Sequence, residues 1–162
     1  MVARRGRRTA LRDCGALSGG IFAHATARFL EQTGTGPRAV VLLDTYHPKT
    51  EGLVGLIAQM FAGLFEKEAL FGPFTNARLT AMAWYGQLME DCDLDGITAP
   101  ILFARPRDWA GDADTTTATD AWRTSWDTAH TVVDVEGDHL TMVESMAHRT
   151  AEVIDDWLTS LD

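Results

Sequence analysis

Three short, continuous runs of apolar residues most constrain how this chain can fold. They are RAVVLLD at 38–44, ITAPILFAR at 97–105 and HTVVDVEG at 130–137. Uninterrupted runs rich in branched side chains are typical of strands covered on both faces, which occur mainly in parallel sheets. Parallel neighbours need long crossovers, and the segments between these runs carry apolar residues at helical spacing. The sequence therefore predicts an α/β fold, a mostly parallel sheet with helices on both faces.

The expected helices alternate with these strands. The pattern predicts a mostly buried helix over 19–30, a polar helix near 116–127 and an amphipathic closing helix over 141–161. Two further helices, 51–66 and 76–90, flank the helix breaker FGPF and form a helical insertion at about 50–92.

Size, composition and charge exclude several classes of protein. The chain has 162 residues of which 46% are hydrophobic, enough for one domain with one core. Its net charge of -9 argues against general nucleic-acid binding. No apolar run is long enough to span a bilayer, and the arginine-rich start lacks the apolar core of a signal peptide. We therefore expect a cytoplasmic location, with no membrane and no nucleic-acid partner.

The sequence offers no convincing metal or disulfide site. Cys14 and Cys92 lack ligand or pairing spacing. DCDLDG at 91–96 imitates the start of a calcium-binding loop, but the twelfth position, which needs a glutamate, is Leu102. We expect neither a metal nor a separate cofactor.

An acid and a histidine follow two of the predicted strands. Asp44 ends the run at 38–44, and His139 comes directly after the run at 130–137. Because parallel strands end at one edge of a sheet, these side chains are expected to meet there. Acyl transfer by a serine enzyme needs a nucleophile, a base and an orienting acid, and the order nucleophile, acid, histidine is that of the α/β-hydrolases.

Several motifs together resemble one known group, the C-terminal thioesterase domains of modular type I polyketide synthases, and more loosely those of peptide synthetases. The resemblance is carried by SGGIFAHATARFLE, GPRAVVLLDTYHP, APILFARP, VDVEGDHLTMVE and the final DDWL. It implies an α/β-hydrolase fold with a helical lid, Asp44 as the acid of a catalytic triad and His139 as its general base.

The resemblance also implies a substrate and a partner. The substrate is a polyketide chain held as a thioester on the phosphopantetheine arm of an acyl carrier protein. The chain passes to a serine and then to water or to its own hydroxyl, giving an acid or a macrolactone. Whether two copies pair as a homodimer stays open. We expect the lid to contain an acyl channel that Trp84 and Tyr85 help to close. The residues expected to line it are Leu53, Leu56, Ile57, Met60, Phe61, Leu64 and Phe65.

The expected nucleophile is displaced. The turn before the nucleophile's helix has the form Gly-His-Ser-x-Gly-Gly in this family, and GALSGG at 15–20 places Leu17 at the serine. Ser18 serves as nucleophile only if the motif is shifted by one residue, to Ala16-x-Ser18-x-Gly20. The sequence leaves three outcomes: a domain that is inactive by itself, weak use of Ser18, or a non-catalytic interaction module that binds the carrier protein.

The start of the chain also departs from the family. A buried strand should precede this turn, but RRGRRTALRDC places charges there, and burying an unpaired charge costs several kcal/mol. We therefore expect 1–17 to be an atypical basic segment and 18–162 to be the thioesterase-like domain. A fragment, or a start or frame error in the coding sequence, is the expected cause.

Overall fold

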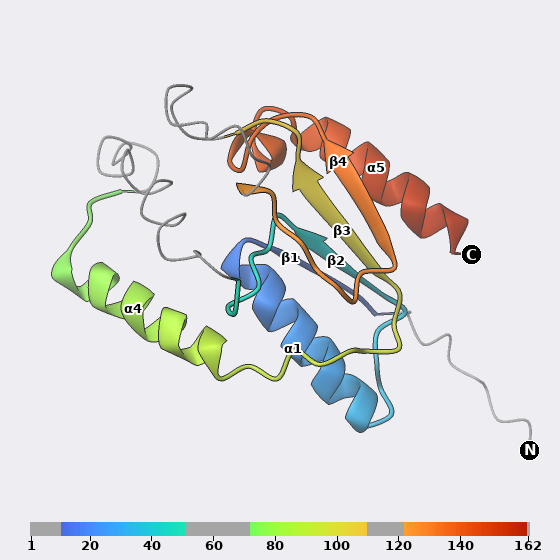
Figure 1. Cartoon of the computed structure of the whole chain (residues 1–162), viewed down its shortest axis with the longest axis horizontal. Coiled ribbons are helices and arrows are strands. Elements are labelled where there is room, and N and C mark those ends of the chain that lie inside the picture. The colour runs from blue at the N-terminus through green and yellow to red at the C-terminus, as the bar shows by residue number, and fades with distance from the viewer. Residues whose placement is uncertain (1–10, 51–71, 110–121, 162) are drawn as a thin grey trace, which may run out of the picture.

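The computed structural model describes residues 11–50, 72–109 and 122–161. Its described strands form one four-stranded, wholly parallel sheet in the order β1-β2-β3-β4. The strands are β1 (Arg12–Ala16), β2 (Ala39–Leu43), β3 (Ile101–Pro106) and β4 (Thr131–Val135). The helices are α1 (Ser18–Gln32), α4 (Asn76–Glu90), α5 (Ala147–Ser160) and the short 3-10 helix η4 (Thr141–Val143). The predicted α/β architecture is confirmed (Figure 1).

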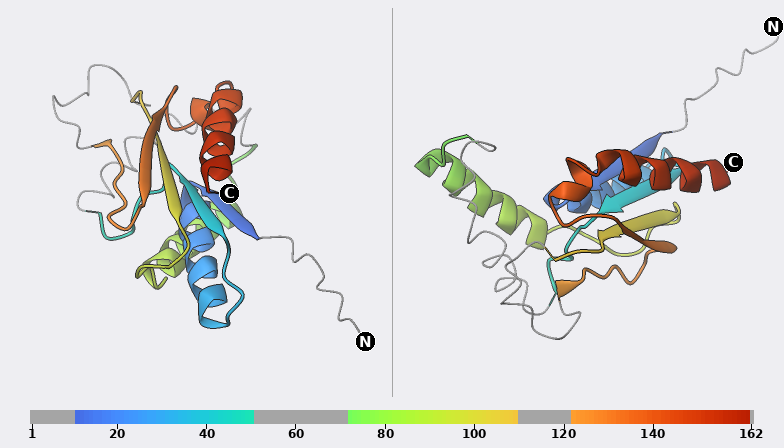
Figure 2. Two further views of the ribbon diagram at one scale, coloured as in Figure 1. Left: turned by 90° about the vertical axis from the view of Figure 1, so that its right-hand side faces the viewer. Right: turned by 90° about the horizontal axis from the view of Figure 1, so that it is seen from above.

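The sheet has a helix on each face (Figure 2). Successive side chains of a strand point to opposite faces, so the central strands contribute to two separate cores. On the α1 face, Val40 and Leu42 pack with Ala27 and Phe103. On the opposite face, Val41 and Leu43 belong to a cluster that the side chains of α5 complete. All five residues of β2 are buried, which explains their continuous apolar character.

The first strand corrects an expectation. Residues 12–16 pair in parallel with β2, Arg12 opposite Ala39 and Ala16 opposite Leu43. The expectation that charges keep this stretch out of the sheet is therefore wrong. Within the described residues β1 lies at the edge of the sheet, where Arg12 is exposed and only Gly15 of the strand is buried. An edge strand keeps its charged side chains in water, so the rule for central strands does not apply.

Two helix predictions need smaller corrections. The closing helix starts at Ala147, after the separate turn η4, because the Asp138 carboxylate accepts the backbone N–H groups of Leu140 and Thr141 and holds a turn there. Residues 124–126 are not helical, and Trp126 is buried against Phe103. Residues 116–121 of that predicted helix lie outside the described residues.

The insertion is described only in part. The predicted helix at 76–90 is present as α4, with the Thr75 hydroxyl accepting the backbone N–H of Arg78 at its start. The helix expected at 51–66, with its channel residues, lies outside the described residues. No residue of α4 is buried; Tyr85 meets Phe22 of α1 edge to face, whereas Trp84 is 63% exposed. Helix α4 extends away from the sheet (Figure 1).

None of the helices in the described ranges is long and apolar enough to cross a membrane.

A fully buried histidine lies between α1 and the sheet. His24 has no exposed surface, and its ring lies 5.2 Å from that of Trp126. Neither ring nitrogen has a hydrogen-bond partner in the described part of the chain. Burial, with added repulsion from Arg28, lowers the pKa of His24 below its ordinary value of 6.5. The folded state therefore favours the neutral form of this ring.

Stability should fall in mild acid because of this residue. Below pH 6.5 the unfolded chain binds a proton at His24 that the folded chain excludes. The free energy of unfolding, measured with urea over a pH series, should decrease as the pH falls through that range. His24→Leu should flatten this dependence and add about 1 kcal/mol or more at neutral pH, because it removes unpaired buried nitrogens. Equal slopes for the wild type and His24→Leu would contradict the prediction.

Candidate active site

A single residue connects β1 to α1. Leu17 has φ 56° and ψ -130°, a region in which residues with side chains are strained by about 1–3 kcal/mol. Its N–H donates to the Leu43 carbonyl at 3.0 Å, and its own carbonyl accepts the N–H of Gly20 at 3.1 Å. The sheet and the helix thus hold Leu17 at the apex of a sharp strand-to-helix turn, the position and shape of a nucleophile elbow.

The neighbouring glycines fix the register of this elbow. A Cβ on Gly15 would lie 2.3 Å from the Gly19 carbonyl oxygen, and one on Gly20 would lie 1.9 Å from the Thr45 hydroxyl. Strand and helix approach this closely only because both positions lack side chains. The structure therefore places Leu17 at the apex, and Ser18 is the exposed first residue of α1. A nucleophilic role for Ser18 stays a prediction.

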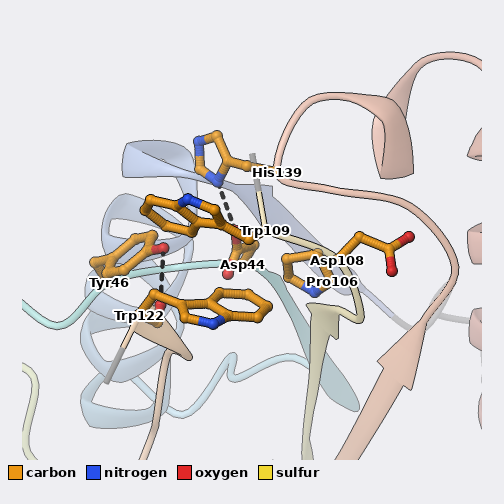
Figure 3. A pocket seen from close by; sticks show the side chains of 7 residues that line it. All are labelled: Asp44, Tyr46, Pro106, Asp108, Trp109, Trp122 and His139. Carbon is orange, nitrogen blue, oxygen red and sulfur yellow. Dashed lines mark hydrogen bonds and ion pairs between the residues drawn. The ribbon is translucent and has the colours of Figure 1, made fainter. Parts of the chain in front are cut away.

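The expected acid and base meet. The His139 Nδ1 lies 2.5 Å from Oδ2 of Asp44, whose other oxygen accepts the Thr124 hydroxyl at 2.9 Å (Figure 3). Asp44 is 1% exposed, so it is a buried carboxylate with both oxygens paired. A carboxylate in this position holds imidazole with its proton on Nδ1, leaving the Nε2 lone pair as the basic site. The contact between Asp44 and His139 was predicted; their catalytic roles stay a prediction.

The loop that carries His139 is rigid for local reasons. Gly137 has φ 94°, and a Cβ there would lie 2.7 Å from the Thr141 hydroxyl. The Asp138 carboxylate accepts two backbone N–H groups at 2.9 and 2.8 Å, and the Thr141 hydroxyl accepts the N–H of Asp138 at 2.8 Å. The GDHLT motif therefore encodes a closed turn that presents the imidazole at the end of β4.

Thr124 is the member of this site that sequence reasoning missed. It is 3% exposed and lies 80 positions from Asp44, in a segment without regular structure. Arg105 helps to position it by donating to the Thr124 carbonyl at 3.4 Å and to Asp134 at 2.6 Å. Partial burial opposes ionisation of Asp134, yet the hydrogen bond and charge of Arg105 keep the pKa of Asp134 below its ordinary value. No local pattern around Thr124 marks it as a partner for a carboxylate.

A narrow, mostly aromatic pocket lies beside the acid–base pair. Figure 3 shows the rings of Tyr46, Trp109 and Trp122 grouped next to Asp44, with His139 at one end. The Tyr46 hydroxyl donates to the Trp122 carbonyl at 3.3 Å, and the two indole rings lie 5.6 Å apart. Burial and the charge of Asp44 raise the pKa of Tyr46, so this phenol stays protonated. Pro106 and Asp108 complete the lining, whereas Trp84 and Tyr85 of α4 are not part of it.

In the ranges that the structure describes, no three His, Cys, Asp or Glu side chains gather to form a possible metal site.

Comparison with known proteins decides the family. A family profile described as Thioesterase domain matches residues 18–158. The chain belongs to this family. It is 40% identical over 163 residues to the polyketide synthase GfsE of Streptomyces halstedii, and 36% identical over 148 residues to the spectinabilin polyketide synthase system protein NorC of Streptomyces orinoci. The match covers 99% and 89% of this chain but only 4% and 6% of those proteins.

A solved thioesterase domain shares the fold. The Vlm2 thioesterase domain, determined with genetically encoded 2,3-diaminopropionic acid and a bound dodecadepsipeptide, aligns with a TM-score of 0.55 and 21% identity. The alignment covers 90% of this chain and 65% of that one. The predicted kinship with polyketide synthase thioesterases and the predicted α/β-hydrolase fold are thus confirmed.

The close approach at the elbow yields a direct test. Gly15→Ala should lower the free energy of unfolding by about 2 kcal/mol, because the added methyl group meets backbone atoms that cannot move aside. Gly19→Ala is the matched control: nothing lies within 4 Å of a Cβ there, so this change should be neutral or slightly stabilising. Urea denaturation of the two variants measures the difference. Equal effects would contradict the elbow geometry.

Proposed function

We propose that this domain receives polyketide acyl chains as thioesters from an acyl carrier protein, and that Asp44 and His139 form the acid–base part of its active site. The kinship with polyketide synthase thioesterases supports this substrate class. The phosphopantetheine arm enters as part of the substrate, so no separate cofactor is required. In a complete site the acyl chain would pass to a serine and leave by hydrolysis or macrolactonisation.

We further propose that this chain does not form an acyl-enzyme. The observation that carries this point is the residue at the elbow. Leu17 occupies the strained apex, and its side chain has no oxygen that could attack a thioester. Ser18, one residue later, is the exposed first residue of the helix rather than the apex of the turn. The site therefore has a base and its orienting acid but lacks the group that would accept the acyl chain.

The acid–base pair and its aromatic surroundings support a second candidate, carrier-protein binding without turnover. The buried pair of Asp44 and His139 and the aromatic side chains beside it are present although the apex carries leucine. Tight binding of an acylated carrier protein, without release of its acyl chain, would favour this interaction module.

Restoring the nucleophile tests the proposal. Leu17→Ser should create a serine that reacts with a fluorophosphonate and hydrolyses an acyl-N-acetylcysteamine thioester about 10²-fold or more faster than the unmodified chain, because nucleophile and base then act together. Mass spectrometry of the labelled peptide and release of the thiol measure the two effects.

Two control variants define the outcome. Ser18→Ala should leave the behaviour of both chains unchanged, and combining Leu17→Ser with His139→Ala should abolish the gain. Phosphonate labelling of the unmodified chain at Ser18 would contradict the proposed role of Leu17.

A further inference from the structure

We propose that the Asp44–His139 pair acts directly on water, giving this domain a slow thioester hydrolysis in which water attacks the thioester itself and no acyl-enzyme forms. The inference rests on the proposed function in one respect, namely that acyl thioesters enter this site. The activity it adds, direct hydrolysis, remains possible when leucine stands in place of the nucleophilic serine.

The base is complete although the nucleophile is absent. Asp44 binds Nδ1 of His139 with one oxygen and is held by the Thr124 hydroxyl through the other, so the imidazole is fixed in position. Within the described residues, Nε2 of His139 has no hydrogen-bond partner. The His139 side chain keeps 12% of its surface exposed. A neutral imidazole with a free Nε2 lone pair that solvent can reach is a general base for water.

The other described histidines lack this arrangement. His24 is fully buried, and the Nδ1 atoms of His47 and His130 accept backbone N–H groups from Lys49 and Ile101. In the described part of the chain, His139 is the histidine that is ion-paired with a carboxylate. We therefore assign the activation of water to the His139 imidazole.

The residue at the apex leaves the base available. In a serine enzyme the hydroxyl occupies the base by hydrogen bonding to it. The Leu17 side chain can neither donate nor accept a hydrogen bond, and Ser18 belongs to the helix. Water is then the nucleophile for the base to activate.

The start of α1 supplies stabilisation for the negative charge that forms on the carbonyl oxygen. The first N–H groups of a helix have no acceptor within the helix, and its dipole is positive at this end. Here the Gly20 N–H is used by the Leu17 carbonyl, while the first turn has neither a side-chain cap nor an acidic residue. The N–H groups of Ser18 and Gly19 have no acceptor within the helix, and in this proposal they are the donors to the oxyanion.

The proposed step balances with water as the only co-reactant. As the water oxygen bonds to the thioester carbonyl carbon, Nε2 takes a proton from it and the imidazolium is stabilised by Asp44. Collapse of the tetrahedral intermediate breaks the C–S bond, and the departing thiolate takes the proton from the imidazolium. The products are a carboxylic acid and a thiol, and His139 returns to its starting state.

Hydrolysis of butyryl-N-acetylcysteamine by the full chain tests the inference, with the released thiol measured against buffer alone. The unmodified chain should exceed the buffer rate, and His139→Ala should reduce the excess by about 10²-fold, the lower range of a general base. Replacement of the exposed His148 of α5 by Gln should leave the rate unchanged. Intact-protein mass spectrometry should show no acyl adduct on the unmodified chain during turnover.

Chemical rescue distinguishes loss of the base from loss of the fold. Added imidazole should restore hydrolysis to His139→Ala, above the rate of imidazole without protein, if the variant keeps its site. Equal rates for the unmodified chain and His139→Ala, or an adduct on Ser18 with loss of activity in Ser18→Ala, would overturn the inference. Turnover by Leu17→Ser with an inert unmodified chain would overturn it and leave the proposed function standing. Inertness of Leu17→Ser as well would overturn both.

Discussion

The buried carboxylate of Asp44 is the group on which the rest of the site depends. Removing a carboxylate from water costs several kcal/mol unless hydrogen bonds replace its hydration. Here the Thr124 hydroxyl and the His139 imidazole provide those bonds, from segments 80 and 95 positions away in the chain. The backbone N–H of Asp44 also donates to Ala104, which keeps the residue in line with the sheet. Two irregular segments must therefore converge on the end of β2 for the fold to be satisfied.

The turn at Leu17 has the backbone geometry of a nucleophile elbow although its side chain is not a nucleophile. The conformation of Leu17 is imposed by its neighbours: β1 pairs with β2, α1 packs on the sheet, and Gly15 and Gly20 allow close approach. None of these interactions involves the side chain at position 17. Backbone strain is consequently retained whichever residue occupies the apex, and the loss of a hydroxyl there leaves the fold intact. The backbone atoms of the turn determine its conformation, whereas the side chain at position 17 determines whether it can attack a thioester.

The location of charge along the chain follows from the position of each strand in the sheet. β2 and β3 are central and almost entirely apolar, whereas β1 at the edge carries the exposed Arg12 and the half-buried Asp13. Charged side chains such as these are unfavourable in a central strand, which is buried on both faces, but they are compatible with an edge strand. This difference explains why a reading based on apolar runs found three of the four described strands and rejected the fourth.

The sequence by itself determined the parallel α/β class, the strands that end at Asp44 and before His139, and the meeting of these two residues. Those features follow from local patterns and from the rule that parallel strands end at one edge. Only the tertiary structure decided that 12–16 is a strand, that Thr124 holds the carboxylate, and that Leu17 rather than Ser18 occupies the apex. These depend on contacts between segments distant in the chain and on one backbone conformation, which residue types alone do not fix.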